Sequence, residues 1–238
     1  MSLKLGVNID HVATLRRARQ ANYPDPLTAA ELCLYVGADA IVIHVRNDDR
    51  HMTEKDLARL CKKYRSYMHL ECNFSEKMQK MALKYKPASV CIVPEQAGEV
   101  TTTGGLKFTP KNFDRIRAMT DALQRKKIRV SLFVDPDAAS IRAAAKCGAD
   151  IVELCTREYS EATTQKAKTK LLRDLALAAL LAKELGLEVH AGHGLDYENV
   201  LPVADLCGIS CMNIGFSIIS RAVLSGLPNA VSAMKELL

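Results

Sequence analysis

The sequence contains no tryptophan, and only 5% of its residues are aromatic. Valine, isoleucine, leucine and alanine must therefore fill most of the core. No apolar run approaches the roughly 20 residues that cross a bilayer, and the first ten residues lack the apolar segment of a secretory signal peptide. These absences predict a cytoplasmic protein that does not act at a membrane.

Motifs for several kinds of chemistry are also missing. The eight cysteines are scattered without a C-x-x-C pair, so we expect them to be reduced and to form no metal site. Neither the G-x-S-x-G turn of serine hydrolases nor the H-E-x-x-H motif of zinc proteases occurs. General acid–base catalysis is therefore the more economical hypothesis for an enzyme activity.

The formal net charge of +6 does not indicate nucleic acid binding, because the basic residues are spread along the chain and few aromatics are available to stack on bases. A small anionic substrate explains the excess equally well. A phosphate monoester carries about −1.5 to −2 charges near neutral pH, so even two phosphorylated substrates would use several cations.

Short apolar runs alternate with longer amphipathic segments throughout the chain. We expect strands over residues 3–9, 40–45, 67–72, 89–94, 129–134, 150–154, 187–191 and 211–215. We expect helices over 25–37, 53–64, 75–85, 109–124, 137–148, 169–186, 197–208, 217–226 and 227–238. Strict alternation implies parallel strands, so the chain is predicted to be an α/β protein, a (β/α)8 TIM barrel forming one domain over 1–238. A doubly wound open sheet is the alternative, but the G-x-G-x-x-G turn typical of it does not follow the first strand.

Local signals support these boundaries. Asp25 before Pro26 suits an N-cap followed by proline at the first helical position, and glycines follow several of the predicted helices. The segments "VGADAIVIHV" (36–45) and "CGADIVELCT" (147–156) precede the second and sixth strands. This echo hints at a duplicated half-barrel, although so short a motif also recurs by chance.

Polar side chains gather at the C-terminal ends of the predicted strands, where barrel enzymes place their chemistry. In strand order these end residues are Asn8, Asp10 and His11; His44 and Arg46; Glu71; Glu95; Asp135; Glu153; His193; and Asn213 with Gly215. Side chains two residues apart share a face of a strand, so several of these groups point together. The strand beginnings are mostly bland, and this asymmetry predicts an enzyme that uses imidazoles and carboxylates for proton transfer.

Structural explanations stay open for some of these groups. Asp10 and Asp135 also suit N-caps of the helices that follow them. The glutamates of the third and sixth strands are also compatible with structural ion pairs, since a buried carboxylate needs a partner. We interpret His69 and His190 as core histidines with satisfied hydrogen bonds.

Three loops are candidates for substrate contact. Residues 191–195 and 213–222 contain glycines and follow the seventh and eighth strands, the usual phosphate site of barrels. Simple turns would explain the same glycines. Residues 94–110, after the fourth strand, are long for such a loop and suit either a lid over the substrate or a disordered insertion.

Together these motifs resemble the pyridoxine 5′-phosphate synthase family of the deoxyxylulose phosphate-dependent pathway to pyridoxal phosphate. The resemblance rests on "GVNIDHVATLRRAR", "YPDP", "HVRNDDRH", "VPE", "EVTT", "AGHGL" and "NIG", in that order and nearly from end to end. It implies a TIM barrel with extra helices that assembles into homo-octamers. It also implies condensation of 3-amino-2-oxopropyl phosphate with 1-deoxy-D-xylulose 5-phosphate to give pyridoxine 5′-phosphate, phosphate and water, with no metal or organic cofactor.

The resemblance further implies residue roles. His44 and Glu71 match proton acceptors, His193 matches the proton donor, and Glu153 matches a residue that stabilises the transition state. The positions that bind the amino ketone phosphate match Asn8, Gly194, Gly215 and Phe216. The positions that bind the sugar phosphate match Asp10, His11, Arg19, Arg46, His51 and Thr101.

One position departs from the family. Phe216 stands where histidine is usual, so an imidazole contact to phosphate is lost while the backbone N–H remains. Arg16 and Arg17 are expected only to decorate the surface. Two alternatives stay open: another barrel enzyme acting on a phosphosugar, although no lysine at a strand end suggests a Schiff-base aldolase, and a non-catalytic protein that only binds.

Overall fold

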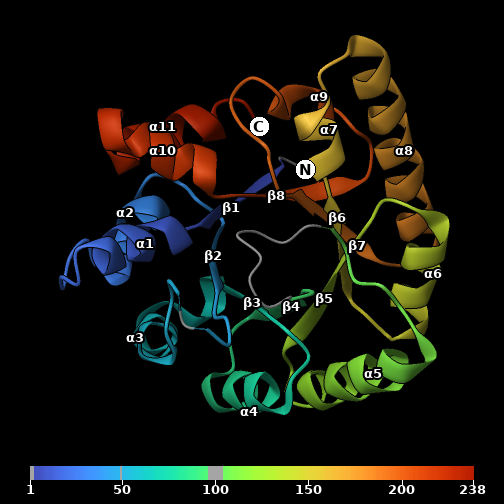
Figure 1. The fold of residues 1–238 in the computed structure, drawn as a ribbon, viewed down its shortest axis with the longest axis horizontal. Helices are drawn as coiled ribbons and strands as arrows, with labels where there is room; N and C mark the ends of the chain where they lie inside the picture. Colours follow the sequence, from blue (N-terminus) through green and yellow to red (C-terminus); the bar gives the residue numbers. More distant parts are fainter. Residues whose placement is uncertain (1–2, 49, 96–103) are drawn as a thin grey trace.

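Eight parallel strands close into a barrel in the computed structural model, which describes residues 3–48, 50–95 and 104–238 (Figure 1). Each strand pairs with its successor in the chain, and β8 pairs back onto β1. The strands are β1 (Lys4–Asn8), β2 (Ala40–His44), β3 (Met68–Cys72), β4 (Ser89–Ile92), β5 (Arg129–Val134), β6 (Ile151–Cys155), β7 (Glu188–Gly192) and β8 (Ile209–Ile214). The predicted barrel is confirmed, and the open sheet is excluded because both edges are paired.

Helices surround this barrel on the outside (Figure 1). They are α1 (Asp10–Ala18), α2 (Pro26–Tyr35), α3 (Glu54–Tyr64), α4 (Glu76–Tyr85), α5 (Pro110–Gln124), α6 (Ala138–Lys146), α7 (Arg157–Glu161), α8 (Gln165–Glu184), α9 (Val200–Ala204), α10 (Phe216–Ser225) and α11 (Leu227–Lys235), with a 3₁₀ turn η1 (Arg65–Tyr67). None of the described helices has the length and hydropathy needed to span a membrane.

All eight predicted strands are present within two residues of their expected ends, but the helices differ in places. The prediction missed α1, which begins immediately after the polar strand end and buries Val12 and Ala13. It also missed the short α7. The predicted helix over 197–208 shrinks to α9 because Asp196 Oδ1 accepts hydrogen bonds from the backbone N–H groups of Glu198 and Asn199, which form a turn there instead.

The helix caps show which aspartates have a structural role at a helix N-terminus and which do not. Asp25 caps α2 as predicted, with Pro26 in the first turn. The idea that Asp10 and Asp135 cap helices is wrong. Asp10 is the first residue of α1 and its side chain caps nothing there, and α6 is capped by Asp137. Asp135 instead accepts a hydrogen bond from the backbone N–H of Gly105.

The two Gly-Ala-Asp segments form equivalent hydrogen bonds in the two halves of the barrel. Asp39 Oδ2 accepts a hydrogen bond from the backbone N–H of Leu5, and Asp150 Oδ2 accepts one from Val130, each 2.8 Å long. Each aspartate therefore ties the start of one strand to the strand before it. The echo in the sequence corresponds to a repeated hydrogen-bond pattern.

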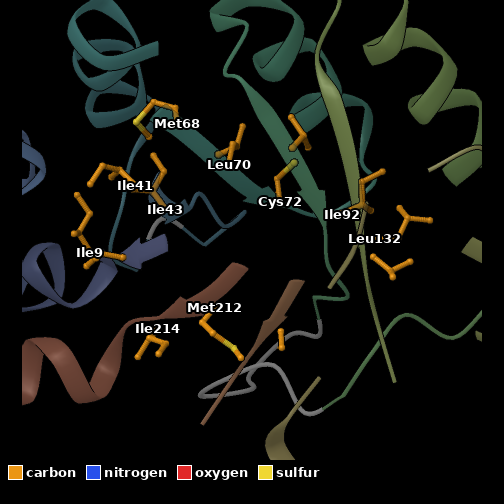
Figure 2. Close-up of a cluster of buried hydrophobic side chains, with 14 of the residues drawn as sticks. Ile9, Ile41, Ile43, Met68, Leu70, Cys72, Ile92, Leu132, Met212 and Ile214 are labelled. Carbon is orange, nitrogen blue, oxygen red and sulfur yellow. The ribbon is translucent and has the colours of Figure 1, made fainter. Parts of the chain in front are cut away.

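Alternate residues of each strand face the helices and form the main core. Figure 2 shows part of this layer, with Ile41 and Ile43 of β2 beside Met68 and Leu70 of β3. All four are completely buried. Val42 is equally buried but lies outside this cluster, as expected for a side chain that points into the barrel. The core thus lies between strands and helices, and the barrel interior is left for other side chains.

Candidate active site

A cavity of about 790 Å³ opens at the C-terminal ends of the strands. Of the fourteen predicted site residues, the following line it: Asn8, Asp10, His11, His44, Arg46, His51, Glu71, Glu153, His193, Gly194, Gly215 and Phe216. Arg19 does not line it; this side chain is exposed where α1 ends. Thr101 and residues 96–103 of the proposed lid lie outside the described residues. The barrel therefore brings residues from both ends of the chain to one rim.

His44 and Glu71 are neighbours because β2 and β3 pair in a register that sets them side by side. His44 Nδ1 lies 3.8 Å from Glu71 Oε2. Asp10 Oδ1 accepts a 2.8 Å hydrogen bond from the backbone N–H of His44, so the loop after β1 is joined to the end of β2. Burial lowers the pKa of His44 well below its usual value, with a further contribution from His51. The imidazole is therefore neutral and suited to accept a proton.

The two glutamates in the barrel differ in charge. Burial raises the pKa of Glu71 well above its usual value, and the neighbouring Glu153 raises it further. Burial raises the pKa of Glu153, but the nearby His69, with smaller contributions from His190 and Asn213, outweighs this effect and lowers the pKa. Environments that push two pKa values apart assign one group as the acid and the other as the anion. Glu71 is therefore the carboxyl that holds a proton more readily, and Glu153 the one that ionises more readily.

Glycines on neighbouring strands make room for Glu153 and its partner Asn213. Asn213 Nδ2 donates a 2.6 Å hydrogen bond to Glu153 Oε2. A Cβ atom on Gly192 would lie 2.6 Å from Glu153 Oε1, and one on Gly6 would lie 2.2 Å from Asn213 Oδ1. Neither position accepts a side chain without displacing this pair, so the two glycines are part of the site.

The turn after β7 holds His193 in a left-handed conformation, with φ of +83°. A side chain other than glycine is strained there, and such strain concentrates at functional sites. Thr156 Oγ1 stabilises the turn by donating to the carbonyls of Gly192 and His193, at 2.8 and 2.7 Å. Asn199 Nδ2 donates to the carbonyl of Gly194 at 3.1 Å. These contacts aim the His193 imidazole at the cavity.

Positive charge at the rim comes from arginines rather than histidines. Burial and Arg50 lower the pKa of His51 to about 4, and they also lower the pKa of His11. Both imidazoles are therefore neutral. Arg46 and Arg50 both line the cavity, and Arg46 is only 1% exposed. The guanidinium groups suit an anionic substrate group such as phosphate.

The first turns of α10 form the other wall. Phe216, Ser217, Ser220 and Arg221 all line the cavity. The Phe216 ring meets the His11 ring edge-on, with centroids 5.3 Å apart, and remains 70% exposed. Because a helix N-terminus attracts anions, this wall is suited to a phosphate even without the usual histidine.

Sequence reasoning missed part of this lining. Arg50 lies inside the "HVRNDDRH" motif but was not singled out, and Arg221 follows Phe216 by five residues on the same helix. The expectation that Arg16 and Arg17 only decorate the surface is wrong. Arg16 forms two hydrogen bonds with the Asp56 carboxylate, and Arg17 Nε donates to the carbonyl of His51 at 2.9 Å. These contacts hold α1 against α3 and the loop that carries His51.

Beneath the cavity the histidines are less satisfied than predicted. His69 Nδ1 lies 2.6 Å from Ser89 Oγ, and His190 Nε2 lies 3.1 Å from Glu188 Oε1. Within the described residues, the second ring nitrogen of each histidine is buried without a hydrogen-bond partner. Each is therefore only half satisfied.

His69, Cys91 and Glu153 form the only cluster in the described part of the chain whose ligand atoms lie close enough to share a metal ion, within 4.8 Å of one another. Burial raises the pKa of the Cys91 thiol well above its usual value. His69 Nε2 and Glu153 Oε2 in this cluster lie 3.7 Å apart and interact with each other directly, and we assign no metal to it.

Comparison with known proteins agrees with the motifs. The profile of the pyridoxal phosphate biosynthesis protein PdxJ family matches residues 5–238. The pyridoxine 5′-phosphate synthase of Elusimicrobium minutum (strain Pei191) is 58% identical over 236 residues, covering 99% of this chain and 98% of that protein. The synthase of Synechocystis sp. (strain ATCC 27184 / PCC 6803 / Kazusa) is 47% identical over 234 residues, covering 98% and 96%. Among solved structures, phosphoribosyl anthranilate isomerase from Thermus thermophilus matches with a TM-score of 0.60 at 12% identity, over 99% of this chain and 98% of that one. That likeness shows the barrel fold alone.

Proposed function

Because the chain belongs to the PdxJ family of pyridoxal phosphate biosynthesis proteins, we propose that it joins 3-amino-2-oxopropyl phosphate to 1-deoxy-D-xylulose 5-phosphate. The products would be pyridoxine 5′-phosphate, inorganic phosphate and water. Family membership confirms the resemblance inferred from the motifs and makes the chain an enzyme of pyridoxine biosynthesis. The substrates, the roles of the residues and the order of steps belong to the proposal.

The proposal rests on one observation: the candidate catalytic residues and most of the candidate phosphate-binding residues line one cavity. Candidate catalytic groups at the ends of β2, β3, β6 and β7 and candidate phosphate-binding groups at the ends of β1, β2, β7 and β8 line the same space of about 790 Å³. A cavity of this size suits small ligands. Two clusters at the rim favour anions: Arg46 and Arg50 on one side, and the start of α10 with Arg221 on the other. This arrangement supports two phosphorylated substrates held with their reacting carbons between the clusters.

Charge assignments support an order of proton transfers. The condensation needs Schiff-base formation, dehydration, loss of phosphate and ring closure, and each step moves a proton. We assign neutral His44 as the first acceptor, which takes a proton from the amine as it attacks the carbonyl. Glu71 begins protonated, so it first donates to a hydroxyl leaving as water and only then accepts. His193 is the second donor, and anionic Glu153 stabilises the cationic iminium that forms.

The phosphate contacts divide between the rim clusters. We assign the amino ketone phosphate to Asn8, Gly194, Gly215 and the backbone of Phe216, where the helix N-terminus favours negative charge. The sugar phosphate would contact Asp10, His11, Arg46 and His51, with Arg19 and Thr101 as further predicted ligands. Burial raises the pKa of Asp10 to about 7, so this carboxyl is largely protonated below neutrality and repels a nearby anion little.

The wider setting is also part of the proposal. We expect a cytoplasmic homo-octamer in which residues 1–238 form one catalytic barrel domain that needs no metal or organic cofactor. Exposed apolar side chains on outer helices, including Tyr35 (87% exposed), Val223 (69%) and Leu224 (92%), support association between subunits. Analytical ultracentrifugation measures the number of subunits directly.

The deciding experiment mixes the purified protein with both substrates and follows the fluorescent pyridine product. We expect product only when both are present. Glu71→Gln should lose most of the turnover while circular dichroism and thermal melting remain unchanged, and exposed Glu76→Gln on α4 is the matched control that should keep full activity. Calorimetric binding of both phosphates without product, or full activity in Glu71→Gln, would contradict the proposal.

A further inference from the structure

Glu153 lies in a setting that opposes a negative charge: burial raises its pKa, yet neighbouring groups, His69 first among them, hold the pKa below its usual value. Its side chain is 3% exposed, and within the described residues it forms no ion pair with a lysine or arginine. An unpaired buried carboxylate is costly and normally takes up a proton. Asn213 supplies one hydrogen bond but no charge. A counter-charge must therefore come from another group inside the barrel.

His69 is in position to supply it. This residue lies two positions before Glu71 on β3, is 3% exposed, and is not among the residues that line the cavity. Its Nε2 atom lies 3.7 Å from Glu153 Oε2 and, within the described residues, has no hydrogen-bond partner. On the other side of the ring, Nδ1 lies 2.6 Å from Ser89 Oγ, a hydroxyl that can accept a hydrogen bond. Both nitrogens can therefore carry hydrogen.

Other titratable groups in the barrel interior do not compete for this role. Burial raises the pKa of the thiols of Cys91 on β4 and Cys211 on β8, so both stay neutral. His190 on β7 lies 5.9 Å from the His69 ring, and burial lowers its pKa. Glu188 lies two residues before His190 on β7 and forms an ion pair with Arg129.

The partner positions on neighbouring strands are uncharged: Val42 pairs with His69 from β2, and Ser89 pairs with it from β4. Further round the barrel, Ser131 on β5 pairs with Cys91. Glu71, on the same strand as His69, has a raised pKa and supplies no positive charge. His69 is thus the one group beside Glu153 suited to hold positive charge, among the residues that the structure describes.

We propose that His69 is a positioning residue: its imidazolium lies beneath the site, keeps Glu153 ionised, and thereby leaves the catalytic proton on Glu71. The consequence for turnover rests on the proposed function, but the charge of the pair does not. Because His69 lies behind Glu153 and outside the cavity, it acts on substrate only through that carboxylate.

The first test is the pH dependence of kcat/KM in His69→Asn, which removes the charge and keeps a polar side chain. Without its counter-charge Glu153 ionises at higher pH, so the acid limb of the profile should move up by about 1–3 pH units. Activity should recover toward the wild-type rate as the pH is raised. Ser131→Ala removes a buried hydroxyl from the same interior without changing charge, and its profile should match wild type. An unshifted acid limb in folded His69→Asn would overturn the proposal.

The second test needs no turnover. The chain has six histidines, so ¹⁵N spectra of the imidazoles can be assigned with single substitutions. At neutral pH both ring nitrogens of His69 should be protonated, and Glu153→Gln should return the ring to its neutral form. A neutral His69 in the wild-type protein would overturn the proposal even if His69→Asn failed to fold. If the two phosphates gave no pyridine product while His69 remained charged, the proposed function would fail and this pairing would stand.

Discussion

The two faces of the same strands have opposite characters. On β6, Leu154 faces the helices and belongs to the apolar core, whereas Glu153, one residue earlier, faces the barrel interior and the cavity. Both are buried, at 0% and 3% exposure. The outer face carries the packing that holds helices to strands. Inside the barrel, the one apolar cluster found among the described residues has just four members: Cys91, Val93, Phe133 and Cys155.

Because successive side chains of a β-strand point to opposite faces, the residues that stabilise the fold and the residues of the candidate active site lie on different faces of the same strands. A substitution on the outer face removes packing and leaves the charges of the site unchanged. A substitution on the inner face alters a network of charges and hydrogen bonds with little loss of apolar burial. The separation is testable with neighbouring residues of one strand.

Glu153→Gln should have the largest effect on activity. The amide still accepts a hydrogen bond from Asn213 but carries no charge, so kcat should fall by about 10²–10³ with little change in melting temperature. Steady-state kinetics alongside thermal melting measure both. A large loss of stability with near-normal kcat in the folded fraction would contradict the claim that the inner face serves chemistry rather than stability.

Leu154→Ala should have the opposite signature. Truncating a fully buried leucine in the core should lower the free energy of unfolding by about 2–5 kcal/mol, while kcat of the folded enzyme stays near wild type. Urea denaturation measures the change. Leu177→Ala on α8, where the side chain is 54% exposed, is the control and should change stability by less than about 0.5 kcal/mol. Similar losses in the two variants would contradict the assignment of the core.

Asp10→Asn should change how stability depends on pH. Burial raises the pKa of Asp10 from 3.8 to about 7 in the folded protein. Between these values the folded state holds a proton that the unfolded chain has lost, so Asp10 makes stability fall as the pH rises through this window. Asp10→Asn removes that contribution, at most about 1.4 kcal/mol per pH unit. From pH 4 to 7 the free energy of unfolding should rise more steeply, or fall less steeply, with pH for Asp10→Asn than for wild type or for Asp114→Asn, at an exposed position on α5. Parallel curves would refute the assignment.

Phe216→His should have the smallest effect. Histidine at the start of α10, the residue that the family resemblance implies there, adds a hydrogen-bond donor beside the proposed amino ketone phosphate. The KM for that substrate should fall by about two- to tenfold with kcat unchanged, as one added hydrogen bond would give. Phe216→Ala separates this gain from loss of the ring contact with His11. An unchanged KM in Phe216→His would mean that the backbone alone binds the phosphate.

Local patterns in the sequence were enough to predict the strands and the rim. Alternating apolar residues mark the outer faces, and polar residues at strand ends such as His44 and Glu71 mark the site, because both signals lie within a few neighbouring residues. Helix α1 was missed because its first turn follows directly on the polar end of β1, and because Arg16 and Arg17 were interpreted as surface residues.

Contacts across the barrel could not be predicted in this way. His69 and Glu153 lie on β3 and β6 and meet only because the closed barrel sets them face to face. The same holds for the hydrogen bond from the backbone of His44 to Asp10. The difference in pKa between Glu71 and Glu153 depends on these contacts. Strand patterns alone therefore offered two equivalent candidate carboxylates, and only the family resemblance gave them different roles.

The charge of these two carboxyl groups is the central claim, and infrared spectroscopy of protein labelled with ¹³C-glutamate tests it directly. At pH 7 the account predicts a band from a buried protonated carboxyl that disappears in Glu71→Gln and persists in Glu153→Gln. Absence of that band in the wild-type protein, or its loss in Glu153→Gln with retention in Glu71→Gln, would contradict the account.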